Sequence, residues 1–204
     1  MRNEIRISGF GGQGVVLAGY ILGKAFSLYA NLEAVMTQSY GPEARGGASS
    51  ANIVVSNREI AYPFVEYPDI LVALSQEAYT KFRPTAKDDA LILIDEDLVE
   101  PLPDDSIYMI PATRLAEDLG RRIVANMIMI GFFTSVTGLI EREKMEESLK
   151  TTVKPKTIPL NLEAFGIGFA YALANYEMLP ASSKKSSVSN SKPRSSQEMM
   201  GIQS

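Results

Sequence analysis

The chain opens with an apolar strand that runs into a glycine-rich turn and then into an apolar helix. The strand is predicted over Ile5 to Ser8, the turn is the sequence GFGGQG from Gly9 to Gly14, and the helix covers Val15 to Ala30. This order starts a βαβ unit, in which free N–H groups and the positive helix end favour an anion such as phosphate or carboxylate. We therefore expect an α/β sheet with a ligand or partner site where its first strand ends.

A second glycine-rich segment, QSYGPEARGG from Gln38 to Gly47, follows the second predicted strand, Leu32 to Thr37. It is longer than a tight turn needs to be. Arg45 stands beside its glycines and can hold a carboxylate or phosphate through two parallel hydrogen bonds. The alternative is an exposed ion pair between Glu43 and Arg45, which contributes only ~0–1 kcal/mol. The residues expected to bind a cofactor or partner group are Gly9, Gly11, Gly12, Gln13, Gly14, Ser39, Tyr40, Gly41, Glu43, Arg45, Gly46 and Gly47.

The first loop also satisfies the glycine spacing of a dinucleotide-binding fingerprint. That fingerprint needs an acidic residue about 20 residues further on to hold the ribose. Glu33 lies near that distance, but it stands at the start of its predicted strand rather than at the end. This weakens the NAD interpretation, although a free-standing nucleotide-binding enzyme with Glu33 or Glu43 as ribose ligand stays an alternative. A further alternative is that the glycines only permit a tight turn and close packing of helix on sheet.

The complete absence of cysteine and histidine restricts the chemistry of the chain. Iron–sulfur clusters, ordinary zinc sites and nucleophilic systems based on Cys or on Ser with His all need one of these residues. We therefore expect no cluster and no metal site on this chain. Any chemistry must involve carboxylates, Lys, Tyr or another chain, and we single out no catalytic residue among these. The net charge of −4 does not suggest nucleic acid. No signal peptide is predicted, because Met1 leads straight into a strand, so the expected location is the cytoplasm.

The rest of the chain continues the alternation of strands and helices. After a strand at Asn52 to Ser56, a turn and a pairing strand at Glu59 to Ala61 predict a hairpin. Ser75 and Thr113 are expected to cap the helices that follow them. Further strands are predicted at Asp69 to Leu74, Ala90 to Ile94 and Ser106 to Ile110. The pattern predicts a three-layer α/β/α domain with a mostly parallel, Rossmann-like sheet.

Two segments permit more than one interpretation. Asp95, Glu96 and Asp97 stand together after a predicted strand and could bind a metal, but a solvated turn is favoured because no other suitably spaced ligands lie nearby. Ile123 to Ile140 carries no formal charge over 18 residues. We reject a membrane span because polar residues and glycines dilute the run, and expect a helix buried in the core or between subunits.

The composition of the chain changes near its C-terminus. Glu141 to Lys150 is a charged helical segment, and Leu160 to Tyr176 is a final amphipathic helix. Ser, Lys, Asn and Gln dominate from Pro180 onward, and such a segment cannot bury enough apolar surface to order itself. We expect one domain over residues 1–180 and a flexible polar tail over residues 181–204. The side chains expected to share one face of the final helix are Leu162, Phe165, Phe169 and Leu173.

Three blocks of the sequence resemble the gamma subunit of 2-oxoacid:ferredoxin oxidoreductases. They are GFGGQGVVLAG from Gly9 to Gly19, QSYGPEARGGASSANIVVS from Gln38 to Ser56, and YPDILVALSQEAYTKF from Tyr67 to Phe82. Three blocks in order are a far more specific signal than one glycine motif. The order Gln-Ser-Tyr before Gly-Pro-Glu is most similar to the 2-oxoglutarate branch of the family.

The resemblance implies one component of a complex that decarboxylates a 2-oxoacid on thiamine diphosphate, passes electrons through [4Fe–4S] clusters to ferredoxin, and transfers the acyl group to coenzyme A. In that family the thiamine diphosphate and the clusters belong to partner chains, which implies alpha, beta and delta subunits here. The chain would be inactive alone, with its loops facing the active-site region or the coenzyme A path. A non-catalytic scaffold stays an alternative, and so does a homo-oligomer of the isolated chain. Neither nucleic acid nor a membrane is implied as a partner.

Overall fold

One six-stranded mixed sheet organises the residues that the computed structural model describes, which are 1–39, 48–103 and 105–176. Its strands are β1 (Arg2–Gly9), β2 (Glu33–Ser39), β3 (Ser49–Ser56), β4 (Ile70–Ala73), β5 (Leu91–Asp95) and β6 (Ile107–Ile110). They lie in the order β2-β3-β1-β4-β5-β6. The β1, β4, β5 and β6 strands are parallel, whereas β3 runs antiparallel to both β1 and β2. The predicted mostly parallel sheet is therefore confirmed, with β3 as the antiparallel strand that separates β2 from β1.

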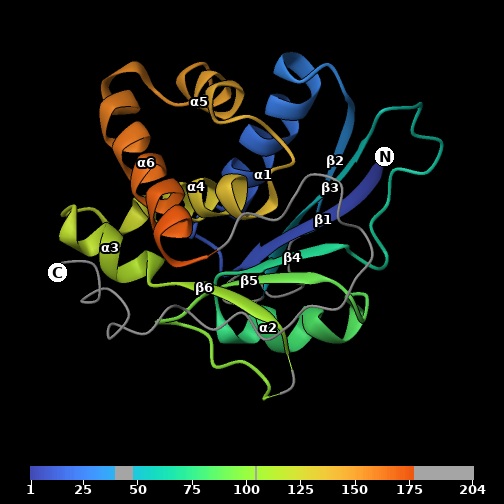
Figure 1. The fold of residues 1–204 in the computed structure, drawn as a ribbon, viewed down its shortest axis with the longest axis horizontal. Helices are drawn as coiled ribbons and strands as arrows, with labels where there is room; N and C mark the ends of the chain where they lie inside the picture. The colour runs from blue at the N-terminus through green and yellow to red at the C-terminus, as the bar shows by residue number, and fades with distance from the viewer. Residues whose placement is uncertain (40–47, 104, 177–204) are drawn as a thin grey trace, which may run out of the picture.

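Helices cover both faces of this sheet, as predicted (Figure 1). The helices are α1 (Val15–Lys24), α2 (Gln76–Phe82), α3 (Ala112–Asp118), α4 (Ala125–Thr137), α5 (Arg142–Lys150) and α6 (Ile158–Asn175). Only α2 lies on the lower face in Figure 1, and the other helices gather above the sheet. A π-helical turn, Ala25–Tyr29, continues α1. The uneven division explains why one apolar core is large and the other, between α2 and the parallel strands, is small.

The α4 helix lies at the centre of the larger core. Every residue from Asn126 to Thr137 is buried, and α6 packs along it. Two glycines permit this approach: a Cβ on Gly131 would lie 2.0 Å from the Phe165 carbonyl oxygen, and one on Gly168 would lie 1.8 Å from the Ile128 carbonyl oxygen. The uncharged segment is thus covered within its own chain rather than between subunits. Its start is open, where Ile123 is 71% exposed, and Gly138 and Leu139 near its end are half-buried.

A different helical stretch, Pro155–Asn175, is long and apolar enough to cross a membrane by length and composition alone. It consists of α6 and the short turn before it, and it packs against α4 through Gly168, Phe165 and Ala172. The predicted apolar face is therefore only partly correct. Phe165 is buried, but Leu173 is 50% exposed.

Three local predictions have different outcomes. Ser75 caps α2, because its hydroxyl accepts a hydrogen bond from the Ala78 N–H at 3.3 Å. Thr113 does not cap α3, which starts after Pro111; its hydroxyl instead donates to Asp95 at 2.6 Å. The hairpin at Glu59 to Ala61 is also wrong, since no strand forms there and β3 pairs with β1 and β2.

Candidate functional site

The first glycine loop lies at the carboxyl end of β1, as the sequence predicts. Phe10 and Gln13 close a turn through a hydrogen bond from the Gln13 N–H to the Phe10 carbonyl at 3.2 Å. Gly12 and Gly14 have φ angles of +94° and +72°, which L side chains rarely adopt. Gly14 immediately precedes α1. Because both φ angles are positive, the conformation of the loop depends on glycine at both positions.

The Gln13 side chain ties this loop to the neighbouring strand. Its Oε1 accepts from the Phe10 N–H at 2.6 Å, and its Nε2 donates to the Leu74 carbonyl at 2.7 Å, just beyond the end of β4. A Cβ at Gly9 would lie 2.5 Å from the same Oε1 atom. Gln13 therefore fills the position between β1 and β4 where ligands enter many α/β sheets. Both Gly9 and Gln13 have a structural task within the loop.

Asn126 forms a hydrogen bond to the end of the loop, a role that the sequence alone does not predict. It stands in α4, is 4% exposed, and donates from Nδ2 to the Gly14 carbonyl at 3.3 Å. A Cβ at Gly14 would lie 2.2 Å from that nitrogen. The signal that the sequence offers is a polar residue inside a long apolar run. A buried amide needs a hydrogen-bond partner, so Asn126 can be expected to have one.

Gly11 and Gly12 form the open side of the loop. A Cβ built on either residue would meet no atom of the described residues within 4 Å. Gly14 precedes α1 without a side chain to cap it, and the first turn of α1 contains no acidic residue. The exposed surface here therefore consists of backbone and a positive helix end, flanked by Phe10 and Leu17, each 39% exposed. Such a surface can accept an anion or the backbone of a partner.

The second glycine loop leaves the sheet at the same end as the first. Ser39 at the end of β2 pairs with Ser50, which in turn pairs with Ser8 of β1. The Ser49 hydroxyl also donates to the Gly9 carbonyl at 3.1 Å. The flanks of the two loops are thus in contact, and Ser39 is exposed there. The other predicted site residues of this loop lie outside the described residues: Tyr40, Gly41, Glu43, Arg45, Gly46 and Gly47.

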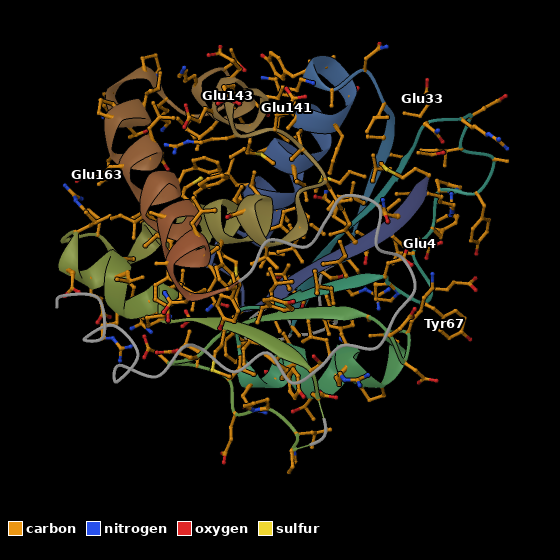
Figure 2. All side chains as sticks on the ribbon, viewed as in Figure 1. Glu4, Glu33, Tyr67, Glu141, Glu143 and Glu163 are labelled. Atoms are coloured by element: carbon orange, nitrogen blue, oxygen red, sulfur yellow. The ribbon has the colours of Figure 1, made fainter. Side chains whose placement is uncertain are left out.

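Glu33 lies at the wrong end of the sheet to bind a ribose beside the first loop. It pairs with Ser56, which pairs with Arg2 at the start of β1, whereas the glycine loop follows Gly9 at the other end (Figure 2). The seven residues of β2 separate the two ends by roughly 20 Å at about 3.3 Å per residue. The dinucleotide interpretation that uses Glu33 is therefore wrong.

The acidic residues after β5 stabilise the start of α3. Asp95 is 1% exposed and accepts from both the N–H and the hydroxyl of Thr113, while Arg114 pairs with Glu96 and Asp97 at 2.8 and 3.1 Å. Burial raises the pKa of the Asp95 carboxyl, and the hydrogen bonds from Thr113 oppose this shift. Among the described residues no group of His, Cys, Asp or Glu is arranged to hold a metal.

A part-buried ion pair lies away from the glycine loops. Arg83 donates from Nε and Nη2 to Asp105 at 2.8 and 2.6 Å, and the Tyr79 hydroxyl donates to the same carboxylate. Burial raises the pKa of the Asp105 carboxyl, but the hydrogen bonds from Arg83 and Tyr79 outweigh it and hold that pKa below its usual value. This cluster fastens α2 to the segment before β6, which is a structural role.

Comparisons with known proteins agree with this architecture. A family model described as pyruvate ferredoxin/flavodoxin oxidoreductase matches residues 4–171. The 2-oxoglutarate synthase subunit KorC of Methanocaldococcus jannaschii is 50% identical over 177 residues, which are 84% of this chain and 95% of that protein. The solved gamma subunit of a keto/oxoacid ferredoxin oxidoreductase from Geobacter sulfurreducens is 39% identical, with a TM-score of 0.78 over 85% of this chain and 98% of that one.

A third relative is much longer. The ketoisovalerate oxidoreductase subunit VorA of Methanothermobacter thermautotrophicus is 35% identical over 179 residues, which are 85% of this chain but 37% of that protein. The same domain thus occurs both as a separate polypeptide and as part of a larger one. The resemblance seen in the three sequence blocks is confirmed, and this chain belongs to the pyruvate ferredoxin/flavodoxin oxidoreductase family.

Proposed function

We propose that this chain is the gamma subunit of a 2-oxoglutarate:ferredoxin oxidoreductase. The observation that carries the proposal is 50% identity with a 2-oxoglutarate synthase subunit across 95% of that protein's length. Fold supports it independently, since the six-stranded mixed sheet is similar to a solved gamma subunit at a TM-score of 0.78. The complex would convert 2-oxoglutarate, coenzyme A and oxidised ferredoxin into succinyl-CoA, carbon dioxide and reduced ferredoxin.

The side chains of this subunit do not fit the redox cofactor of that reaction. An iron–sulfur cluster needs thiolate or imidazole ligands, and the sequence has neither Cys nor His. We therefore assign the [4Fe–4S] clusters and the thiamine diphosphate to the alpha, beta and delta subunits, with ferredoxin as the electron acceptor of the assembled enzyme. The isolated gamma subunit would be colourless and inactive.

The two glycine loops are the part of this subunit that we place near the active-site region or the coenzyme A path. The open backbone at Gly11 and Gly12 and the uncapped start of α1 suit an anionic group or a partner backbone. Arg45 of the second loop carries the charge that would complete such a site, because a guanidinium can bind a phosphate or carboxylate in a bidentate manner. The domain over residues 1–180 would supply these contacts in the cytoplasm, with residues 181–204 as a polar tail.

Reconstitution tests this proposal. The chain is coexpressed with the alpha, beta and delta subunits of its own oxidoreductase, and reduction of ferredoxin is measured with 2-oxoglutarate, pyruvate and a branched-chain 2-oxoacid. We expect the highest kcat/KM with 2-oxoglutarate and no turnover without the gamma subunit. A preference for either other oxoacid would contradict the assignment to the 2-oxoglutarate branch.

Arg45 provides a second test within the same complex. Arg45→Lys should lower kcat/KM for 2-oxoglutarate or coenzyme A by about 1.5–3 kcal/mol in free-energy terms, the size of a hydrogen bond to a charged group. Glu43→Gln serves as the control for a local ion pair. If both variants turn over like the wild type, Arg45 only closes a surface contact.

A further inference from the structure

The segment between β3 and β4, residues 57–69, projects from the sheet beside the N-terminus (Figure 1). We call it the aromatic arm. It carries three large aromatic side chains in the open: Tyr62 is 50% exposed, Phe64 is 55% exposed and Tyr67 is 62% exposed. Figure 2 shows Tyr67 at the rim of the molecule, on the same side as Glu4. Exposed aromatic side chains gathered on one segment mark a contact surface more often than a free one.

The arm is fixed to the sheet although it contains no strand of its own. Val65 is 8% exposed, so its side chain is buried between exposed neighbours. Arg6 of β1 donates from Nη2 to the Val65 carbonyl at 2.7 Å, and Arg2 donates from Nη2 to the Tyr62 carbonyl at 3.0 Å. At its end, the Asp69 carboxylate accepts from the Glu4 N–H at 2.8 Å. The backbone that carries the aromatic rings is therefore held from β1.

Arg6 is well suited to this task because it is itself almost fully buried. It is 8% exposed, and its Nε and Nη1 donate to Asn52 and Thr85 at 2.7 and 2.8 Å. Its guanidinium also lies 5.0 Å from the centre of the Phe82 ring. Desolvation lowers the pKa of Arg6, because burial disfavours the charged form. The hydrogen bonds of the guanidinium, including the one to the Val65 carbonyl of the arm, offset this cost.

The aromatic rings are ordered among themselves as well. The Tyr62 and Phe64 rings meet edge to face with centroids 5.6 Å apart, and the Tyr62 hydroxyl donates to Glu66 at 2.5 Å. Pro63 and Pro68 restrict the backbone between and after these residues. Rings that are already held in place lose little conformational entropy on binding, which is what makes tyrosine and phenylalanine effective anchors.

We propose that the aromatic arm is the surface through which this chain docks an apolar pocket on another subunit of its oxidoreductase. The charges around the rings are of both signs, with Arg58 and Glu59 exposed on the arm itself. To bind a nucleic acid or an anionic membrane, the arm would need a predominantly positive surface. The mixed charges instead fit a protein pocket with a polar rim.

One of the relatives indicates which protein carries this pocket. In VorA the same domain is only 37% of a longer polypeptide, so the natural neighbour of this fold is another part of the same enzyme. This step rests on the proposed function, because it takes the partner from the oxidoreductase complex. The arm also lies at the amino end of β1, away from the glycine loops, so docking there leaves the loops free for the reaction.

The test uses all the subunits of the complex, with an affinity tag on a partner subunit. The variants Phe64→Ala and Tyr67→Ala remove the proposed anchors, and Leu102→Ala is the matched control because its side chain is 58% exposed elsewhere on the molecule. Dissociation constants are measured between the gamma chain and the purified remainder of the complex. Each arm variant should weaken binding by at least about tenfold, the effect of losing an interface anchor, while the control stays within about twofold of the wild type. All variants should melt at the wild-type temperature.

Three other outcomes would overturn the proposal in distinguishable ways. Wild-type affinity in both arm variants would remove the docking role and leave the proposed function intact. A wild-type chain that binds no subunit of the oxidoreductase would remove both. If the isolated wild type dimerises and Phe64→Ala abolishes the dimer without changing assembly of the complex, the arm binds a second copy of this chain instead.

Discussion

Glycine serves opposite purposes in the first loop and in the pair of helices α4 and α6. Around Gly11 and Gly12 a Cβ would meet nothing within 4 Å in the part of the chain that the structure describes, so the missing side chain leaves backbone accessible from outside. Around Gly131 and Gly168 a Cβ would overlap a carbonyl oxygen of the other helix. In the helices the missing side chain lets two backbones touch, an approach at which Cα–H groups contact carbonyl oxygens.

The contrast teaches that a glycine motif identifies a close backbone approach but not the partner in that approach. In α4 and α6 the partner is the same chain, and the effect of a substitution should appear in folding. At Gly11 we propose a partner in the assembled enzyme, so the effect of a substitution there should appear in turnover rather than in folding. Substitutions at individual glycines can separate these two purposes.

The largest effect is expected for Gly168→Ala. The new methyl group would lie 1.8 Å from the Ile128 carbonyl oxygen, so the two central helices must separate. We expect a loss of at least about 3 kcal/mol in the free energy of unfolding, at the upper end of the cost of overpacking a core. Chemical denaturation of the isolated chain measures this loss, and Gly131→Ala should behave in the same way because its Cβ would lie 2.0 Å from the Phe165 carbonyl oxygen.

Gly166 provides the control on the same helix. A Cβ there would have the Arg142 Nη2 atom as its nearest neighbour, at 3.8 Å, which is an ordinary contact. Gly166→Ala should therefore be neutral or should stabilise the chain by about 0.4–1 kcal/mol through the unfolded state. Equal losses at Gly166 and Gly168 would contradict the role of the contact between α4 and α6, because helix propensity favours alanine over glycine at both positions.

Gly14→Ala is expected to have the next largest effect, about 2–3 kcal/mol. A left-handed conformation costs an L residue about 1–2 kcal/mol, and the methyl group would also displace the Asn126 amide, which lies 2.2 Å from the ideal Cβ position. The free energy of unfolding measures the total. Asn126→Ala in the Gly14→Ala background separates the two causes, since the second substitution should cost less there than in the wild type.

The loop and the helix that follows it were predictable because they depend on local sequence. An apolar strand, a turn with four glycines and an apolar helix follow one another, so Ile5 to Ala30 could be assigned from the local sequence. The same holds for β4, β5 and β6 and for the Ser75 cap, whose hydrogen-bond partner is three residues away.

Errors arose where residues distant in the sequence decide the structure. The strand that ends at Ser56 pairs with β1 and β2 rather than with the residues after it, and two arginines of β1 hold those residues in the aromatic arm. Thr113 has a hydroxyl that could cap a helix, but it donates a hydrogen bond to the Asp95 carboxylate, 18 residues earlier in the chain. Likewise, nothing in the sequence identifies Asn126 as the partner of Gly14.

Gly12→Ala should have a smaller effect on stability than Gly14→Ala. Its φ of +94° is unfavourable for alanine, but the space around it is open, so only backbone strain of about 1–2 kcal/mol is expected. Thermal unfolding of the isolated chain measures this difference. Because strain could also move the loop, reduced activity of this variant would not by itself establish a ligand or partner at Gly12.

Gly11→Val is the substitution with the smallest expected effect on folding and the clearest test of the loop. Gly11 has no positive φ, and its Cβ position is open, so the free energy of unfolding should change by less than about 0.5 kcal/mol. In the reconstituted complex, however, the valine side chain would occupy the space beside the start of α1. We expect kcat/KM at limiting coenzyme A to fall by at least about tenfold, which is about 1.4 kcal/mol of transition-state stabilisation. Steady-state kinetics of complexes with equal subunit content measure the fall. Wild-type turnover would show that the glycines at the loop, like those between α4 and α6, serve only the packing of this chain.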